Sequence, residues 1–185
     1  AEILAANGLK VVIVEEGPLR TSSDFKMREA EAYPDLYQES AARKTADKAI
    51  NILQGRCVGG STTVNWTSSF RTPPRTLQWW QSAWGLKRLG VDAMAPWFAA
   101  MEQRLHVGLW PIPPNENNAA LARGAAQLGI PVAVIPRNVK MCWNLGYCGM
   151  GCPTNAKQSM LLTTLPAALT NGAMLISRLR AERFE

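Results

Sequence analysis

A short apolar run near the start of the chain, residues 9–14, leaves few folds open. The run is rich in β-branched residues, which predicts a strand buried on both faces of a parallel sheet. Residues 1–7 are good helix formers, and Gly8 follows them where a helix commonly ends. The run ends in an acidic turn, residues 15–18. Helix, glycine, buried strand and acidic tip are typical of the second half of a βαβ unit, so the predicted class is α/β with a partial Rossmann-like domain.

The acidic residue at the tip of this strand, Glu15, is the first candidate site residue. In dinucleotide-binding βαβ units an acidic side chain at this place accepts hydrogen bonds from a ribose. A strand that simply ends in a solvated glutamate has the same sequence, and the strand alone leaves both interpretations open. The helix before Gly8 lacks a capping residue at its start, so we expect it to begin upstream of Ala1, in a chain truncated there.

The composition narrows the class of protein. The chain has 185 residues, of which 47% are hydrophobic and 18% charged, as in an ordinary globular domain with a core. Its net charge of +6 comes from scattered lysines and arginines, which argues against nucleic-acid binding. There is no apolar run of about 18 residues and no basic, apolar leader, so neither a transmembrane segment nor a signal peptide is predicted. A cytoplasmic location is favoured, with a membrane-associated or periplasmic one left open.

A glycine-rich segment, residues 55–65, is the second candidate for a binding site. The adjacent Gly59 and Gly60 allow backbone to approach a ligand closely, and Ser61 and Thr62 offer N–H groups and hydroxyls at the predicted start of a helix. Phosphate oxygens are commonly held in this way. A turn made of small residues would look similar.

The remaining segments carry weaker signals. Residues 19–48 are polar and are predicted to form a surface segment, in which Pro34 would interrupt any helix. Strands are predicted at 49–54 and 131–135, and helices at 94–105 and 117–128. The only histidine, His106, is expected to be structural rather than catalytic. Four tryptophans are expected in the core rather than against a cofactor: Trp79, Trp80, Trp84 and Trp97.

Three of the four cysteines fall close together, at Cys142, Cys148 and Cys152, in a loop that is rich in glycine. Zinc usually takes four ligands, whereas three thiolates followed by a proline suit an iron-sulfur cluster better. The alternative is a buried loop with reduced thiols or one disulfide.

Taken together, these pieces resemble the glucose-methanol-choline (GMC) family of FAD-dependent oxidoreductases. The family's first signature reads Gly-Arg/Lys-x-Val/Leu-Gly-Gly-Ser-Ser/Thr-x-Val/Ile-Asn, and residues 55–65 fit it position by position. Residues 11–18 are similar to its ribose-binding strand, and Pro96-Trp97-Phe98 with Glu102 to its Pro-Tyr/Trp-Phe-x-x-x-Glu helix. Residues 157–167 are similar to the segment that leads back to the flavin domain.

The resemblance implies roles for single residues. Glu15 would hold the adenosine ribose, and Asn65 and Trp66 would sit near the flavin ring. Some members tether the flavin through a histidine where this chain has Val64, so FAD is expected to be non-covalent. One departure is that Phe70 and the proline after it come one step later than usual, which predicts a reshaped loop over the flavin. The diphosphate and its approach would be lined by Arg56, Gly59, Gly60, Ser61 and Thr62.

The implied activity is hydride transfer from a CH–OH group, in an alcohol or a sugar, to FAD. The catalytic base is expected beyond the chain, which would be truncated at both ends and inactive alone. The implied domains are 1–75 (FAD-binding), 76–140 (cap or substrate-side insertion) and 141–185 (cysteine loop, helix and strand returning to the FAD domain).

Two questions stay open after the resemblance is drawn. The cysteine spacing also resembles that of bacterial sugar dehydrogenases of this family, in which an iron-sulfur cluster relays electrons away from the flavin. An electron-transfer module built on these cysteines and an inert fragment of the fold are the alternatives to a flavoenzyme. The sequence specifies neither the substrate nor the electron acceptor, for which oxygen, a quinone or a cytochrome are candidates.

Overall fold

A computed structural model describes residues 1–183, which form an α/β fold. The chain divides into two compact units. The first consists of Ala1–Thr67 together with the chain from Val139 onwards, and the second is Ser68–Asn138. The predicted domain limits of 1–75, 76–140 and 141–185 stay a prediction.

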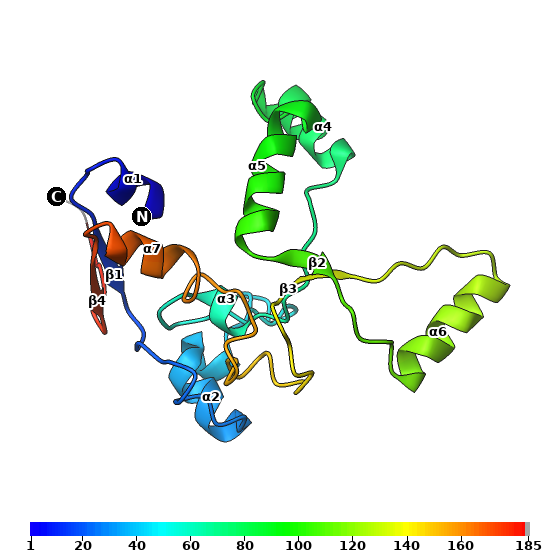
Figure 1. The fold of residues 1–185 in the computed structure, drawn as a ribbon, viewed down its shortest axis with the longest axis horizontal. Coiled ribbons are helices and arrows are strands. Elements are labelled where there is room, and N and C mark those ends of the chain that lie inside the picture. Colours follow the sequence, from blue (N-terminus) through cyan, green and yellow to red (C-terminus); the bar gives the residue numbers. More distant parts are fainter. Residues whose placement is uncertain (184–185) are drawn as a thin grey trace. The chain divides into compact units, whose positions relative to one another are not determined.

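The first unit contains a pair of parallel strands, β1 (Val12–Glu15) and β4 (Met174–Ser177), joined in register from end to end. The helices α1 (Glu2–Ala6) and α7 (Thr164–Thr170) precede them in sequence. Small residues allow these helices to pack closely on the strands, in a core cluster of Ala5, Ala168 and Ala173 with Val11 and Ile13. Figure 1 shows α1 and α7 next to each other beside the strand pair.

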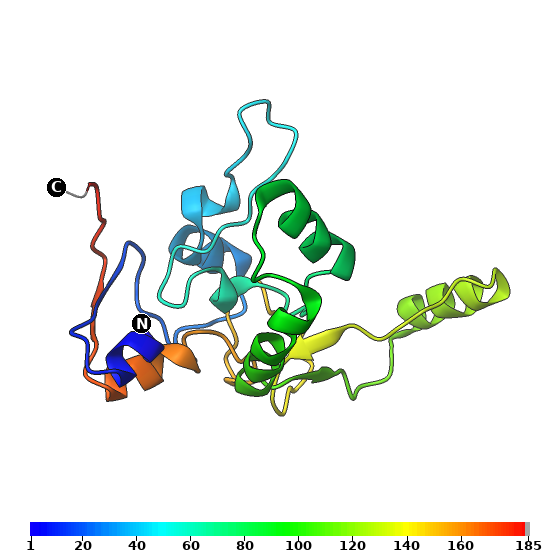
Figure 2. The ribbon, with the colours of Figure 1, turned by 90° about the horizontal axis from the view of Figure 1, so that it is seen from above.

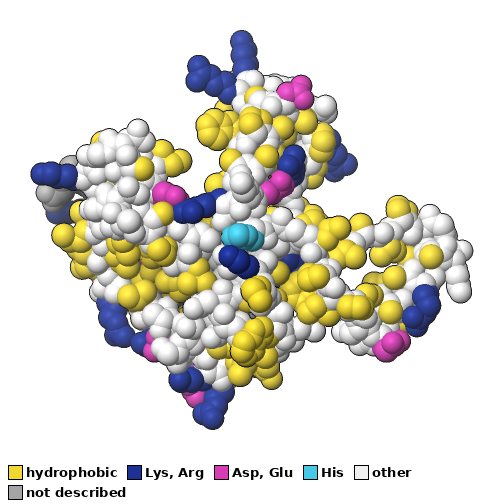
Figure 3. Space-filling view, in the orientation of Figure 1, with side chains coloured by type: hydrophobic (Ala, Val, Ile, Leu, Met, Phe, Trp, Pro, Cys, Tyr) yellow, Lys and Arg dark blue, Asp and Glu magenta, His cyan; other side chains and the backbone are white. Residues whose placement is uncertain are grey.

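Only one face of this strand pair is covered by the described residues. Val12 and Val14 are 57% and 42% exposed, and their neighbours Met174 and Ile176 are exposed as well. Figure 3 shows hydrophobic side chains gathered in this region. The prediction of a strand buried on both faces is therefore wrong for residues 1–183. Burying both faces requires a layer on each side of the sheet, and α1 and α7 form only one.

A second core in the same unit surrounds α2 (Glu29–Leu36). Phe25 and Leu36 are buried there, and the helix continues through Pro34. The prediction that residues 19–48 form a polar surface excursion with no helix is thus wrong. Packing of the apolar face of α2 outweighs the missing N–H of the proline. The core cluster consists of Phe25, Ala32, Leu36, Tyr37, Cys57, Val64 and Met150.

The chain between this helix and the glycine-rich segment has little regular structure. A 3-10 turn, η1 (Gln38–Ala41), is followed by isolated bridges from Tyr37 to Gly55 and from Lys44 to Asn51. The strand predicted at 49–54 is wrong. All six of its residues are exposed, so burial does not stabilise the extended conformation that their alternation suggested.

The second unit consists of three helices and a short antiparallel pair. Its helices are α4 (Pro74–Trp84), α5 (Val91–Arg104) and α6 (Glu116–Gln127). Strand β2 (Val107–Leu109) pairs with β3 (Pro136–Asn138), so the strand predicted at 131–135 is wrong in position. Figures 1 and 2 both show α6 at the end of two extended segments, apart from α4 and α5.

The helices predicted at 94–105 and 117–128 are confirmed, with earlier starts for both. Asn115 caps α6 by accepting a hydrogen bond from the Asn118 N–H at 3.0 Å. In residues 1–183, no helix has both the length and the apolar character that crossing a membrane requires.

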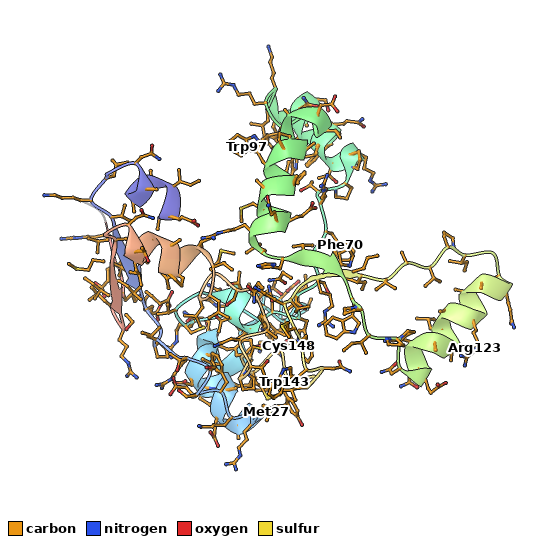
Figure 4. The ribbon with its side chains drawn as sticks, viewed as in Figure 1. Met27, Phe70, Trp97, Arg123, Trp143 and Cys148 are labelled. Carbon is orange, nitrogen blue, oxygen red and sulfur yellow. The ribbon has the colours of Figure 1, made fainter. Side chains whose placement is uncertain are left out.

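The tryptophans of the second unit are mainly at the surface. Trp79, Trp84 and Trp97 are 55%, 66% and 68% exposed, and Trp97 is labelled in Figure 4. The expectation that they lie in the core is wrong within the described residues. The helical spacing of α4 and α5 was correct, but these two short helices present more apolar side chains than they can bury against each other.

Candidate functional site

The glycine-rich segment forms a tight turn that leads into α3 (Ser61–Val64). Gly59 has φ +92, and a Cβ there would lie 2.4 Å from the Thr63 hydroxyl oxygen. Gly60 has φ +58 and ψ −150, a region essentially restricted to glycine. Both predicted glycines are therefore required by backbone conformation, and the predicted short helix follows them directly.

Hydroxyl groups of the segment hold this turn from inside. The Gly55 N–H donates to the Ser61 hydroxyl at 2.9 Å. The Thr62 hydroxyl donates to the Gly59 carbonyl at 2.6 Å and accepts from the Met160 N–H at 2.9 Å. The turn is thus fixed in shape before any ligand arrives.

The acidic end of β1 lies against this turn. A Cβ at Gly17 would stand 2.1 Å from the Arg56 carbonyl oxygen, so only glycine permits the approach. The Val58 N–H donates to the Pro18 carbonyl at 3.0 Å, which joins the two segments. Glu15 accepts a hydrogen bond from the Gly17 N–H at 2.7 Å through one carboxylate oxygen. The structure therefore brings the predicted ribose and diphosphate segments together within the first unit.

Arg56 has an incompletely satisfied guanidinium. One terminal nitrogen lies 3.8 Å from the Glu16 carboxylate, a long and partly exposed ion pair. Its Nε atom is buried and has no hydrogen-bond partner in the described part of the chain. A buried donor without a partner costs about 1–3 kcal/mol, which an anionic ligand would relieve. This atom is the observation that best fits a diphosphate to the predicted residues.

The two residues after α3 are exposed. Asn65 accepts from the Thr67 N–H at 3.2 Å, and the Trp66 side chain, 54% exposed, lies against the backbone of Gly149. Val64, by contrast, is buried in the second core. The predicted flavin-facing residues are therefore accessible, while the residue at the tether position points inward.

A lysine to which the sequence analysis gave no site role is buried next to this segment. Lys157 is 2% exposed, and its Nζ donates to the carbonyls of Thr63, Asn65 and Cys148 at 2.8, 2.7 and 2.6 Å. Lysine is rarely buried, and no spacing in the sequence pairs it with a segment more than 90 residues away.

Two other buried groups flank the turn. Tyr37 donates to the Gly149 carbonyl at 2.6 Å, and burial raises its pKa to about 12. Burial also raises the pKa of Cys57, which is 1% exposed, to about 11. Cys57 is therefore a protonated, inert thiol at neutral pH.

The cysteine loop does not form a metal site in the described residues. Within residues 1–183 no three histidine, cysteine or acidic side chains are grouped so that they could hold a metal ion. Cys142, Cys148 and Cys152 are half-buried thiols outside any disulfide. Cys142 accepts from the Asn144 N–H, and Cys152 from the Lys157 N–H, both at 3.4 Å. The predicted iron-sulfur cluster is not supported, because the described residues contain no such group and the thiols of Cys142 and Cys152 bind their own loop.

The loop's environment still affects one thiol. Burial opposes ionisation of Cys152, but hydrogen bonds from the Thr154 hydroxyl and from nearby backbone N–H groups outweigh it and lower its pKa. Gly151 serves packing, since a Cβ there would stand 2.2 Å from the Phe25 ring.

A pocket of the first unit lies elsewhere. It has a volume of about 410 Å³, and its lining includes Phe25, Leu36 and the Arg20–Asp35 ion pair. None of the predicted cofactor residues lines it. We therefore place the candidate site at the turn, on backbone geometry, and not at this pocket. His106 lies in the second unit and is exposed.

Comparisons with a family profile and with known proteins agree on the family of this chain. The GMC oxidoreductase family profile matches residues 33–185. Two long-chain-alcohol oxidases of Arabidopsis thaliana are 34% and 30% identical over 98% and 99% of this chain, which covers 24% of each. An uncharacterized GMC-type oxidoreductase of Mycobacterium tuberculosis is 35% identical over 99% of this chain and 30% of its own length. The chain thus spans about a quarter of the length of the first curated relatives that it matches. The family profile covers most of the chain, and the glycine turn and the acidic strand end agree with it. The chain belongs to the GMC oxidoreductase family.

Proposed function

We propose that the protein is an FAD-dependent oxidoreductase that oxidises the CH–OH group of an alcohol. The observation that carries the proposal is the backbone contact of Gly17 with Arg56, because it sets Glu15 beside the turn at 55–65. The parallel pair β1 and β4 with helices on one face supports a Rossmann-like arrangement around them. Family membership supports FAD as the cofactor.

Each predicted residue has a part in this proposal. The second carboxylate oxygen of Glu15 accepts hydrogen bonds from the adenosine ribose. Arg56 directs its buried Nε to the diphosphate, and the glycines at 59 and 60 let backbone approach it. The adjoining Ser61 and Thr62 keep the turn in shape. Asn65 and Trp66 face the flavin ring.

Bound FAD supplies the acceptor for the substrate hydride. A base must then take the hydroxyl proton, and no residue of this chain is assigned that task. Val64 is buried and lacks a nucleophilic nitrogen, which supports non-covalent attachment of the flavin.

The relatives' names support a proposal for the substrate class. Two of them are named long-chain-alcohol oxidases, which favours a long-chain alcohol over a sugar. Oxygen as the electron acceptor is proposed on the same ground.

The test uses the intact protein, purified and assayed without oxygen. A long-chain primary alcohol should bleach the flavin absorbance faster than a short-chain alcohol or an aldose does. Heat or acid precipitation should leave the yellow chromophore in the supernatant. Intact protein that contains no flavin, or flavin that no alcohol reduces, would refute the proposal.

A further inference from the structure

Lys157 occupies an unusual position for a charged side chain. It forms an isolated antiparallel bridge with Val139 and is almost completely buried. An ammonium group has three N–H donors, and here all three reach backbone carbonyls, at 2.6 to 2.8 Å. Burying an isolated cation is expensive, so a lysine held this way needs all of these hydrogen bonds.

Two of the three carbonyls that Lys157 binds lie at the end of α3. The last carbonyls of a helix have no partner within the helix. Lys157 donates hydrogen bonds to the carbonyls of Thr63 and Asn65, which precede it in the chain by 94 and 92 residues. Its third bond, to Cys148, ties the cysteine loop to the same point; Cys148 is labelled in Figure 4.

Tyr37 completes this arrangement. Its hydroxyl lies 3.3 Å from the Val64 carbonyl, between the two carbonyls that Lys157 holds, and donates to Gly149 at 2.6 Å. The carbonyls of residues 63 and 65 are therefore held by the buried ammonium, and the Tyr37 hydroxyl lies beside the carbonyl between them. The next side chains, Asn65 and Trp66, are exposed.

We propose that Lys157 is the positioning residue of the flavin site, which fixes the backbone at Thr63 and Asn65 so that Asn65 and Trp66 meet the flavin ring. The proposal rests on the function proposed above. It also gives the cysteine loop a role, because that loop is the third point to which the ammonium is bound.

The first experiment replaces Lys157 with methionine in the intact protein. Lys157→Met keeps the length and apolar stem of the side chain and removes the three donors. The apo-protein is titrated with FAD while flavin fluorescence and the visible absorption bands are followed. We expect FAD to bind at least about tenfold more weakly, because hydrogen bonds from charged groups are the strong ones, and the bands of the bound flavin to shift.

The matched control is Lys140→Met. Lys140 is exposed, and its backbone N–H donates to the Ala156 carbonyl, next to Lys157. This variant makes the same chemical change in the same region but leaves the hydrogen bonds of the Lys157 ammonium intact. It should therefore bind FAD like the wild type. If Lys157→Met lowers the unfolding temperature but binds FAD like Lys140→Met, with unshifted bands, Lys157 is only structural and the proposal is overturned.

A second variant and a wild-type measurement cover the case in which Lys157→Met does not fold. Lys157→Gln keeps an N–H donor group on a shorter chain, and should weaken FAD binding by about threefold to tenfold. Unchanged affinity in this variant contradicts the proposal. In the wild type, FAD should slow hydrogen exchange in residues 63–67 and 147–150 together, and protection of the first segment alone contradicts it. A wild type without FAD refutes the proposed function instead, so the two failures are distinguishable.

Discussion

At the scale of single residues, the candidate site depends on closely packed positions, where a small change in a side chain alters its structure. Gly17 is one of these, because its backbone meets the backbone of Arg56 where no side chain fits. Cys57 is another, because it is buried within the turn and its thiol lies 3.7 Å from the Gly60 carbonyl. Both lead to predictions for the intact protein.

Replacing Gly17 with alanine should separate β1 from the turn. The added Cβ would meet backbone atoms of Arg56, which cannot move aside as a flexible side chain can. We expect a loss of about 1–3 kcal/mol in the free energy of unfolding, measured by denaturant titration, and weaker FAD binding. The control is Gly124→Ala in α6, where a Cβ meets nothing within 4 Å and should stabilise by about 0.5–1 kcal/mol. Equal stabilities for the two variants would show that the contact is absent.

Cys57 should make the protein lose stability in alkali. Its folded-state pKa of about 11 lies above the ordinary value of 9.0, so the folded state keeps a proton that the unfolded state releases. The stabilisation is complete below pH 9 and is lost as the pH rises towards 11, by about 3 kcal/mol in total. Cys57→Ala should flatten the stability curve between pH 9 and 11, measured by urea unfolding at each pH. An unchanged slope in this variant would assign the alkaline loss to other groups.

At the scale of elements, α2 illustrates competition between local propensity and packing. Pro34 stands inside an eight-residue helix and lacks the N–H that would bind the Ala30 carbonyl. The helix forms because Ala32 and Leu36 are buried in the second core. Burial of these side chains therefore stabilises the helix by more than Pro34 destabilises it.

Replacing Pro34 with alanine should stabilise the protein by about 1 kcal/mol, because it restores a helical hydrogen bond and removes the ring clash. The measurement is the thermal unfolding midpoint, which should rise. Ala30→Gly, at an exposed position of the same helix, should lower it by weakening helix propensity. A midpoint that falls in Pro34→Ala would indicate that the proline's fixed φ stabilises this segment more than the lost hydrogen bond costs.

At the scale of the whole molecule, the described residues leave much apolar surface uncovered. It includes the open face of β1 and β4 and the tryptophans of α4 and α5. Monomeric soluble proteins rarely expose large contiguous apolar patches. When the 185-residue chain is produced alone, this surface should bind a hydrophobic dye such as ANS.

The open sheet face can be tested by a paired change. Val12 and Met174 are partners in register, 57% and 59% exposed. Val12→Lys combined with Met174→Glu would place opposite charges across the strands and should lower dye fluorescence without unfolding the chain, as judged by circular dichroism. Leu121→Lys in α6 changes an exposed side chain of the second unit and serves as the comparison. Equal dye binding by the paired variant and the wild type would mean that this face is not the binding surface.

The features that could be predicted from the sequence depend on neighbours along the chain. The turn at residues 59 and 60, the start of α3 and the extent of α6 follow from glycine conformation, short polar caps and helical spacing, which act over a few residues. The same holds for the acidic end of β1. Because these signals are local, Glu15 and the turn at 59–62 could be proposed from the residues themselves, whereas Arg56, Asn65 and Trp66 were implied by the family resemblance.

The remaining features depend on residues far apart in sequence. Whether a strand is covered on one face or two, whether a proline is tolerated in a helix and whether tryptophans are buried are decided by the elements that pack against them. The cysteines were close in sequence, yet their thiols bind their own loop. The sequence placed Lys157 in a segment similar to the family's but did not indicate its burial, because carbonyls of residues 63 and 65, more than 90 residues away, and of Cys148 had to converge before burying its charge became favourable.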